Sequence, residues 1–475
     1  MIKDHAIAII FVHLFMRNIF CLLISIAFFT ACSKKSDNII KGNNPPEPKD
    51  TVKQYQTPFV SVPDPKDVIM YEVNFGAYSQ LQNIAGVTAR LDSIKALGIN
   101  VIWLMPTYPI GKLKSIGSPY CVQNYLQVNP NIGTLIDLRN LVAQAHAIGM
   151  SVILDWVGND TSWDNPWITA HPDWYQQDGS GNIIYPPGTT YTDVAALNYN
   201  NTSMRQAMIS AMKYWVLEAN IDGYRCDFAD NIPDDFWSQA IDTLQTMKHK
   251  LVLLAEGSKT SHFASGFQMI YGWNYFTALE NVFNGSAAAS SLYAVDLSDN
   301  SSVPAGDFML RFTSNHDEES DGNDALTVFN GQAGSMAAFV LTAYESGVPL
   351  LYGGQEVGAP KTDYGSETAR IDWTANPGML AAYKKILAFR NSSEAIKTGT
   401  LSYFDINNVA AFEKVSGTDI ALVMVNVNTN NSAISVQLPP ALANTNWKDA
   451  MNNNAAVDLG PIYTLEPYQY LVLTK

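Results

Sequence analysis

Cysteine is scarce in this chain of 475 residues, which contains only four. Cys21 lies inside an N-terminal apolar run and Cys32 at its end, so only Cys121 and Cys226 belong to the remainder. Two isolated cysteines do not make a disulfide framework, and they lack the clustering of a zinc site. We therefore expect both to be buried thiols.

Positive charge is also in short supply, with 29 Lys and Arg against 44 Asp and Glu and a formal net charge of -15. Without a basic surface to neutralise phosphates, nucleic acid is not expected as a partner, and neutral sugars fit better. No solenoid-type repeat is present. Hydrophobic residues make up 47% of the chain, including 23 Tyr, 20 Phe and 10 Trp, which predicts a large folded core.

An apolar run over residues 19–29 follows Arg17 and ends at Thr30-Ala31-Cys32. This pattern predicts an export signal over residues 1–31. A small residue before a cysteine resembles the bacterial lipobox, which implies that Cys32 carries a lipid and becomes the mature N-terminus. The alternative, an uncleaved membrane helix, is disfavoured because Arg17 separates this run from an earlier apolar segment, residues 6–15, and neither is long enough to span a membrane.

Residues 32–58 are polar, contain several prolines and show no apolar period, so they predict a flexible tether. Ser33-Lys34-Lys35 lacks the acidic residue that would favour retention at the inner membrane. We expect an outer-membrane lipoprotein that contacts the membrane through its lipid, facing either the periplasm or the cell surface.

Strand-like apolar runs alternate with segments of helical period through residues 59–391, which predicts repeated strand-helix units around a parallel sheet. The predicted strands are Val68–Val73, Val101–Met105, Ser151–Asp155, Gly223–Asp227, Leu251–Glu256, Phe267–Tyr271, Met309–Ser314 and Pro349–Tyr352. Eight such strands indicate a closed α/β barrel.

The predicted helices are Val87–Leu97, Leu135–His146, Thr202–Ala219, Asp234–Lys248, Gln332–Ser346 and Gly378–Phe389. Thr202 and Asp234 are suitable N-caps. The connection of about residues 157–201 is too long for a usual strand-to-helix loop and predicts an insertion. Its aromatic residues either stack on sugar rings or pack a small core of their own: Trp156, Trp163, Trp167, Trp174 and Tyr175.

Residues 392–475 contain short alternating runs without long helices, which predicts a small antiparallel β-sandwich. Its predicted strands are Thr398–Phe404, Val409–Val415, Ile420–Asn426, Ala433–Gln437 and Tyr468–Leu473.

Carboxylates gather where the predicted strands end. Asp227 ends the fourth strand, Glu256 ends the fifth, and Asp317 follows the seventh. The carboxyl ends of barrel strands converge on one face, so three carboxylates are predicted to share a cavity. A close pair supplies the nucleophile and the acid/base of retaining glycoside cleavage. Arg225 shares a strand face with Asp227 and is expected to keep it ionised.

Several segments resemble, in order, the signatures of the α-amylase family of glycoside hydrolases. They are Ser118-Pro119-Tyr120, Asn129-Pro130 to Gly133-Thr134, Asp155-Trp156-Val157-Gly158-Asn159, Gly223-Tyr224-Arg225-Cys226-Asp227, Ala255-Glu256-Gly257, Phe312 to Asp317, and Gly347-Val348-Pro349 with Gly354-Gln355-Glu356. The resemblance implies a TIM (β/α)8 barrel with a short insertion after the third strand and a C-terminal antiparallel β-sandwich.

The resemblance also implies catalytic roles: Asp227 as nucleophile, Glu256 as acid/base and Asp317 as the third carboxylate that holds sugar hydroxyls. It further implies substrate-binding roles for Arg225, for His316, and for Tyr120 as a stacking platform. The implied substrate is an α-glucan such as starch or a maltooligosaccharide, cleaved at α-1,4 bonds with retention of configuration.

The chain departs from the family at three places. Asp160 stands where a sugar-binding histidine is usual, so substrate affinity or preference is expected to differ. Ala196 replaces the usual calcium-binding aspartate, and Asp230-Asn231 replaces a usual Lys-His. Asn159 is retained as an oxygen ligand, but calcium wants six to eight oxygens. We expect no required cofactor and a structural calcium site that is weak or lost.

Two alternatives to α-1,4 hydrolysis stay open. One is a neopullulanase-like, α-1,6-directed or glucosyl-transferring enzyme of the same family, since transfer requires only that a sugar hydroxyl replace water. The other is a glucan-binding lipoprotein with a retired active site, suggested by Asp160 and the altered residues after Asp227. The presence of the whole acid/base group argues against this second alternative.

Overall fold

The computed structural model describes residues 53–247, 250–360, 370–428, 430 and 432–475. The predicted export signal, Cys32 and most of the predicted tether lie outside these ranges. Among the residues that are described, no helix combines the length and the apolar character needed to cross a membrane.

Eight parallel strands in the described ranges close into a barrel in the order β1-β10-β9-β8-β7-β6-β3-β2. They are β1 (Met70–Val73), β2 (Val101–Leu104), β3 (Ser151–Val157), β6 (Gly223–Asp227), β7 (Val252–Ala255), β8 (Met269–Tyr271), β9 (Phe308–Arg311) and β10 (Val348–Tyr352). Almost every strand residue is buried because the barrel interior covers one face and helices cover the other. The predicted barrel is confirmed, and each strand overlaps a predicted run.

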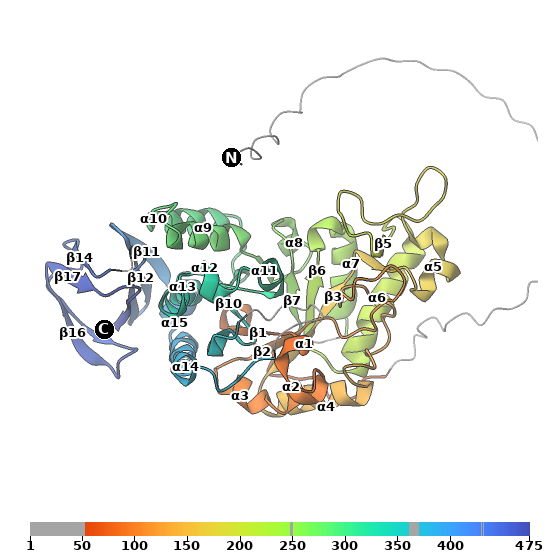
Figure 1. Cartoon of the computed structure of the whole chain (residues 1–475), viewed down its shortest axis with the longest axis horizontal. Helices are drawn as coiled ribbons and strands as arrows, with labels where there is room; N and C mark the ends of the chain where they lie inside the picture. The colour runs from red at the N-terminus through yellow and green to blue at the C-terminus, as the bar shows by residue number, and fades with distance from the viewer. Residues whose placement is uncertain (1–52, 248–249, 361–369, 429, 431) are drawn as a thin grey trace, which may run out of the picture. The chain divides into compact units, whose positions relative to one another are not determined.

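Helices and short 3₁₀ turns connect the strands, and Figure 1 shows α9 and α10, in green, beside each other. The α-helices of the barrel region are α1 (Phe75–Tyr78), α2 (Ile84–Thr88), α3 (Leu91–Lys95), α4 (Leu135–Ala147), α6 (Thr202–Glu218), α7 (Asp234–Gln245), α8 (Ser261–Ala264), α9 (Trp273–Phe283), α10 (Ser290–Asn300), α11 (His316–Asp321), α12 (Ala325–Val328), α13 (Gln332–Tyr344), α14 (Pro377–Ser392) and α15 (Glu394–Thr398). The 3₁₀ turns are η1 (Pro65–Asp67), η3 (Ala229–Asn231) and η4 (Gln355–Val357).

Helix starts differ slightly from the sequence prediction. The N-cap of α6 is Asn201, whose side-chain oxygen accepts hydrogen bonds from the Ser203 and Met204 N–H groups, so the prediction of Thr202 is one residue late. The N-cap of α7 is Pro233 rather than Asp234, which lies in the first turn. The single helix predicted over 87–97 is two short helices, α2 and α3, while α9 and α10 were not predicted.

The insertion after β3 contains β4 (Asp160–Ser162), α5 (Pro166–Ala170), η2 (Pro172–Trp174) and β5 (Val194–Ala196), and β4 pairs antiparallel with β5. Trp156, Trp174 and Tyr175 are buried. Trp167 packs edge-on against Trp174 with ring centroids 5.0 Å apart. Trp156, Trp174 and Tyr175 therefore belong to the main hydrophobic core rather than to a separate small one, and Trp163 and Trp167 pack against that core partly buried.

The C-terminal residues form two antiparallel sheets, a larger one in the order β11-β12-β13-β18-β15-β16 and a smaller one of β14 and β17. Their strands are β11 (Thr400–Ile406), β12 (Val409–Ser416), β13 (Asp419–Asn426), β14 (Ile434–Gln437), β15 (Thr445–Asp449), β16 (Ala455–Leu459), β17 (Ile462–Leu465) and β18 (Tyr470–Thr474). Figure 1 shows the labelled strands of this group in blue. Leu422 and Met424 of the larger sheet share a core with Val436 and Leu465 of the smaller one. The predicted sandwich is confirmed, and β15, β16 and β17 are additional strands.

A buried lysine joins the larger sheet to the helical region. The Lys414 Nζ of β12 donates to the Glu345 carbonyl after α13, at 2.8 Å, and to the Ile396 carbonyl of α15, at 2.7 Å. Burial lowers the pKa of Lys414 to about 7. Because Lys414 is almost completely buried, these carbonyls replace the water that its ammonium group loses.

The end of the predicted tether is already part of the folded body. The Tyr55 N–H donates to the Leu217 carbonyl of α6 at 2.8 Å, and the Arg139 guanidinium lies 4.0 Å from the Tyr55 ring centroid. The Asn220 side chain bonds both Gln54 and the Thr57 carbonyl. The predicted tether boundary at residue 58 is therefore too late, because polar side chains here bind α6 and the residues after it.

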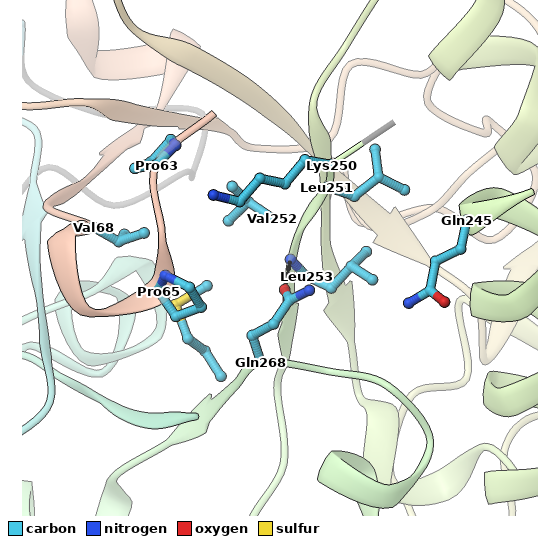
Figure 2. A pocket seen from close by; sticks show the side chains of 10 residues that line it. Pro63, Pro65, Val68, Gln245, Lys250, Leu251, Val252, Leu253 and Gln268 are labelled. Carbon is cyan, nitrogen blue, oxygen red and sulfur yellow. Dashed lines mark hydrogen bonds between the residues drawn. The ribbon is translucent and has the colours of Figure 1, made fainter. Parts of the chain in front are cut away.

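A cavity of about 270 Å³ lies at the N-terminal ends of β1, β7 and β8. Figure 2 shows Lys250 and Gln268 in its lining together with Pro63, Pro65 and Leu253. Because the barrel strands are parallel, this cavity is at the opposite end of the barrel from Asp227 and Glu256. It therefore plays no part in the predicted chemistry.

Gly223 allows β6 to lie close to β7. Its φ is +148°, and a Cβ there would lie 1.9 Å from the Val252 carbonyl oxygen. Only glycine avoids both the strained dihedral and this clash. The residue thus fixes the register that pairs Cys226 with Ala255 and carries Asp227 and Glu256 to the same rim.

We expect Gly223→Ala to destabilise the protein by about 2–4 kcal/mol, because β6 must move away from β7 to admit the methyl group. Urea unfolding followed by circular dichroism measures this change. Gly179→Ala is the control: no heavy atom lies within 4 Å of its added Cβ, so the change should stay within about 0.5 kcal/mol. Equal stabilities of the two variants would contradict the role assigned to Gly223.

Candidate active site

Arg225 is the centre of the candidate site, and its side chain is completely buried inside the barrel. In the register of β3 and β6 it lies opposite Asp155. Its Nη1 donates to Asp155 Oδ1 at 2.8 Å and to Asp227 Oδ1 at 2.8 Å. The cation therefore neutralises one carboxylate from the neighbouring strand and one from its own.

The other terminal nitrogen of the same guanidinium contacts Glu256, which directly follows β7. Arg225 Nη2 forms an ion pair of 2.5 Å with Glu256 Oε1. The Glu256 Oε2 accepts a hydrogen bond of 2.7 Å from the Phe228 N–H. The side chains of Asp227 and Glu256 are 17% and 14% exposed, so both reach the opening of the barrel. The predicted carboxylate pair is thus brought together across one arginine.

Burial raises the pKa of Asp227 well above its ordinary value, and the charge of Glu256 raises it further, while Arg225 opposes both effects. Burial likewise raises the pKa of Glu256, again opposed by Arg225. Two carboxylates this close do not ionise independently, so the pair retains a shared proton to higher pH than either group would alone. The expectation that Arg225 keeps the pKa of Asp227 low is therefore not met, because burial and the charge of Glu256 outweigh the guanidinium.

The third predicted carboxylate, Asp317, lies in the first turn of α11, where the Asn315 side chain accepts from the Asp317 N–H at 2.9 Å. Its side chain is 44% exposed and its Oδ1 lies 3.3 Å from His316 Nε2. The charge of Asp317 also raises the pKa of Glu256. Asp317 therefore faces the opening beside the pair.

Tyr120 and His316 stand together on the wall of the site. Their rings are stacked, with centroids 5.2 Å apart and an interplanar angle of 18°. The Tyr120 hydroxyl is 2.8 Å from His316 Nε2 and donates to Asp155 Oδ2 at 3.0 Å. This network connects both predicted substrate-binding residues to the arginine cluster.

Glu72 is a site residue that the sequence analysis missed. It lies in β1, is fully buried, and its Oε1 is 2.6 Å from His316 Nδ1. Asp155 and Tyr271 were also given no role, although the Arg225 Nε is 3.3 Å from the Tyr271 hydroxyl. The sequence did contain a signal for Glu72, an acidic residue inside a strand predicted to be apolar. A buried carboxylate without a partner is costly, so a charged or hydrogen-bonding partner could have been expected.

Asp317 and Glu72 together keep His316 charged. Burial alone would lower the pKa of His316, but the charges of Asp317 and Glu72, with the Glu72 hydrogen bond, raise it to about 9. His316 is therefore a cation at neutral pH, with Nδ1–H donating to Glu72 and Nε2–H directed toward Tyr120 and Asp317.

Asp160 begins β4 near the same cluster, and its charge contributes to the raised pKa of Asp227. Its carboxylate is buried and its Oδ2 accepts from the Asn159 amide at 3.0 Å. Burial raises the pKa of Asp160 to about 7. Asp160, whose carboxyl group is partly protonated near pH 7, thus lies where the family resemblance implies a histidine.

The calcium ligands of the family are not reproduced in the insertion. Asn159 donates its amide to Asp160, and Ala196, opposite Asp160 in the register, has no side-chain oxygen. The described ranges contain no group of three or more His, Cys, Asp or Glu side chains that could hold a metal ion. These residues do not fit a calcium cage, and the expected weakness of the site stays a prediction.

Asp230, in place of the usual lysine, ties two loops of the rim together. Its carboxylate accepts from the Ser258 N–H at 3.0 Å and lies 2.7 Å from His262 Nε2. The Lys259 Nζ in turn donates to the Asp230 carbonyl. The loops after β6 and β7 are thereby fixed to each other beside Glu256.

Comparison with known proteins agrees with this geometry. The family model described as α-amylase, catalytic domain, matches residues 72–181 and 188–376. Alpha-amylase 3 of Dictyoglomus thermophilum is 26% identical over 62% of this chain and 64% of its own length. An α-1,4-glucan:maltose-1-phosphate maltosyltransferase of Rhodospirillum rubrum is 26% identical over 74% of this chain and 54% of its own length. The chain thus spans about half to two thirds of these curated relatives.

Solved structures share the fold more completely. A maltogenic α-amylase from Thermotoga neapolitana matches 87% of this chain and 99% of its own, with a TM-score of 0.77 and 26% identity. An α-amylase from Lactobacillus plantarum matches 86% of this chain and 99% of its own, with a TM-score of 0.76 and 24% identity.

We expect Glu72→Gln to lower the pKa of His316 from about 9 toward the ordinary histidine value of about 6.5, because glutamine keeps an acceptor oxygen but removes the charge. At pH 8 a smaller fraction of His316 is then protonated in the variant than in the unmodified protein, although Asp317 still favours the cation. An NMR titration of ¹³C-labelled histidine measures this, with His316→Gln identifying the resonance. Glu413→Gln, in the C-terminal sheet, is the control, and an unchanged His316 titration in Glu72→Gln would refute the coupling.

Proposed function

The chain belongs to the α-amylase family of glycoside hydrolases, and we propose that it is a retaining hydrolase that cleaves α-1,4-glucosidic bonds of starch or maltooligosaccharides. The observation that carries this proposal is the contact of one buried guanidinium with both Asp227 and Glu256. A retaining mechanism needs one carboxylate that attacks and one that delivers a proton, both at short range.

In the proposed mechanism, the ionised Asp227 attacks the anomeric carbon, and Arg225 stabilises its negative charge. Glu256 delivers its proton to the glycosidic oxygen, so the bond to the leaving sugar breaks as the bond to Asp227 forms. Glu256, now a carboxylate, then removes a proton from water, which attacks the anomeric carbon and releases Asp227. Asp317 holds sugar hydroxyls and favours the distorted ring, while the cationic His316 donates to the bound sugar.

Transfer to a sugar is a second candidate reaction, and the similarity to a maltosyltransferase supports it. It uses the same glycosyl-enzyme intermediate, with an acceptor hydroxyl in place of water. The contacts of Arg225 with the reacting carboxylates are equally suited to both outcomes. The balance between them depends on how firmly the site holds an acceptor sugar.

Export and lipid anchoring complete the proposal. The apolar run over residues 19–29 and the lipobox-like Thr30-Ala31-Cys32 support it, and the residues concerned lie outside the described ranges. A lipid on Cys32 would keep the enzyme at the outer membrane.

Incubation with maltoheptaose, starch and pullulan, followed by product chromatography, tests the function. We expect maltooligosaccharides from the first two substrates, appearing first as α-anomers in proton NMR because the configuration is retained. Asp227→Asn should lower turnover by at least about 10³-fold, since the nucleophile is lost. Asp458→Asn, exposed on β16, is the control that should keep full activity.

Other product patterns would change the assignment. Panose from pullulan would establish the neopullulanase-like alternative, because panose retains the α-1,6 bond. Maltotriose from pullulan would establish α-1,6 cleavage, and products longer than the substrate would establish transfer. Glucan binding without any turnover would overturn the proposal in favour of a binding protein.

A further inference from the structure

Phe228 immediately follows Asp227 and is held against Glu256. Its N–H donates to Glu256 Oε2 at 2.7 Å, and the next N–H, of Ala229, donates to the Glu256 carbonyl at 2.9 Å. Phe228 therefore lies beside the group that protonates the leaving oxygen in the proposed mechanism.

The backbone of Phe228 is strained. Its φ of 49° and ψ of 39° place it in the left-handed region, which bulky residues rarely adopt. The two hydrogen bonds to Glu256 hold it there, and such strain at a site is typical of a position that serves the chemistry. The conformation fixes the direction of the half-buried ring at the rim.

Tyr191 reaches the same place from the insertion. Its ring meets that of Phe228 edge to face, with centroids 6.2 Å apart, and its side chain remains 51% exposed. Burial raises the pKa of Tyr191, and the charges of Asp317, Asp227 and Glu256 raise it further.

The segment that carries Tyr191 is held in place. The Trp163 Nε1 donates to the Thr192 carbonyl at 3.0 Å, and the Tyr191 N–H donates to Thr189 Oγ1 at 3.2 Å. The Trp163 ring is itself covered by the Lys114 ammonium, 3.5 Å from its centroid. Trp163 therefore supports the segment, and Tyr191 presents the exposed ring.

We propose that Tyr191 and Phe228 form an aromatic platform that stacks on the sugar ring of the leaving group and, in the reverse direction, on an acceptor sugar. The apolar C–H face of a glucosyl ring suits an exposed aromatic surface, while its hydroxyls remain in water. The platform thus determines specificity beyond the cleaved bond. This inference rests on the proposed function.

The test compares two substrates that differ only in the leaving group. Maltotetraose leaves a sugar on the platform, whereas the fluoride of α-maltosyl fluoride leaves nothing there. We expect Tyr191→Ala to lower the ratio of kcat/KM for maltotetraose to kcat/KM for the fluoride by about two- to tenfold, the range for one aromatic contact. With maltose as acceptor, the yield of transfer products should fall as well.

Two further variants control the experiment. Tyr191→Phe keeps the ring and should keep the ratio. Tyr185→Ala removes a tyrosine of similar exposure, 43%, from the same insertion and should leave the ratio unchanged. Turnover of the fluoride reports that each variant is folded.

The outcomes separate this inference from the function on which it rests. An unmodified protein that turns over neither substrate would overturn the proposed function. Activity on both substrates, with a ratio that Tyr191→Ala does not change, would overturn the platform alone. A loss in Tyr191→Phe as large as in Tyr191→Ala would also overturn it, because the hydroxyl rather than the ring would then be responsible.

Discussion

The site depends on one buried cation. Arg225 has no access to water, so its charge must be balanced entirely by protein groups, and Asp155, Asp227 and Glu256 balance it. Separating the buried guanidinium from these carboxylates would leave an uncompensated charge, which is strongly unfavourable. The three carboxylates are therefore kept in a fixed geometry around Arg225. Three carboxylates around one cation leave an excess of negative charge. Because the excess is buried, it raises the pKa of both Asp227 and Glu256, so the pair favours retention of a shared proton, which the proposed mechanism uses.

This geometry requires the barrel register to be exact at one strand pair. Asp155 lies opposite Arg225 because β3 and β6 are paired in that register, and a shift by one residue would turn Arg225 out of the barrel. The close approach at Gly223 fixes the other side of β6 against β7. Backbone contacts then extend the order beyond the strands, since the Glu256 N–H donates to the Cys226 carbonyl and the Ala229 N–H to the Glu256 carbonyl. The packing and register of the strands therefore determine where Asp227 and Glu256 lie.

The sequence predicted the barrel strands well because each is a short apolar run with a polar residue where it ends. It also predicted a shared site for Asp227, Glu256, Asp317, Arg225, Tyr120 and His316; the structure brings these side chains together, and their roles stay predictions. It missed contacts that depend on tertiary placement. Glu72 and His316 are distant along the chain and meet only because closure of the barrel makes β1 a neighbour of β10, next to β9. No local sequence pattern around Tyr191 predicts its position, which depends on the path that the insertion takes. Helix starts such as Asn201 were missed by one residue because several adjacent polar side chains could serve as caps.

In the proposed site, buried barrel residues lie on one side of the cleaved bond, and residues of a surface segment lie on the other. On the side proposed to hold the reacting sugar, Tyr120, His316 and Glu72 form hydrogen bonds and stacking contacts with barrel groups that are almost fully buried. Side chains held in this way have little freedom, so they suit a sugar whose position must be precise. On the leaving-group side, Tyr191 belongs to a surface segment held by a few hydrogen bonds, and only the backbone of Phe228 is tied to the catalytic pair. Loops change more readily than strands, because fewer buried contacts depend on them. Chain length and the choice between water and a sugar acceptor can therefore vary through the insertion while the chemistry stays constant.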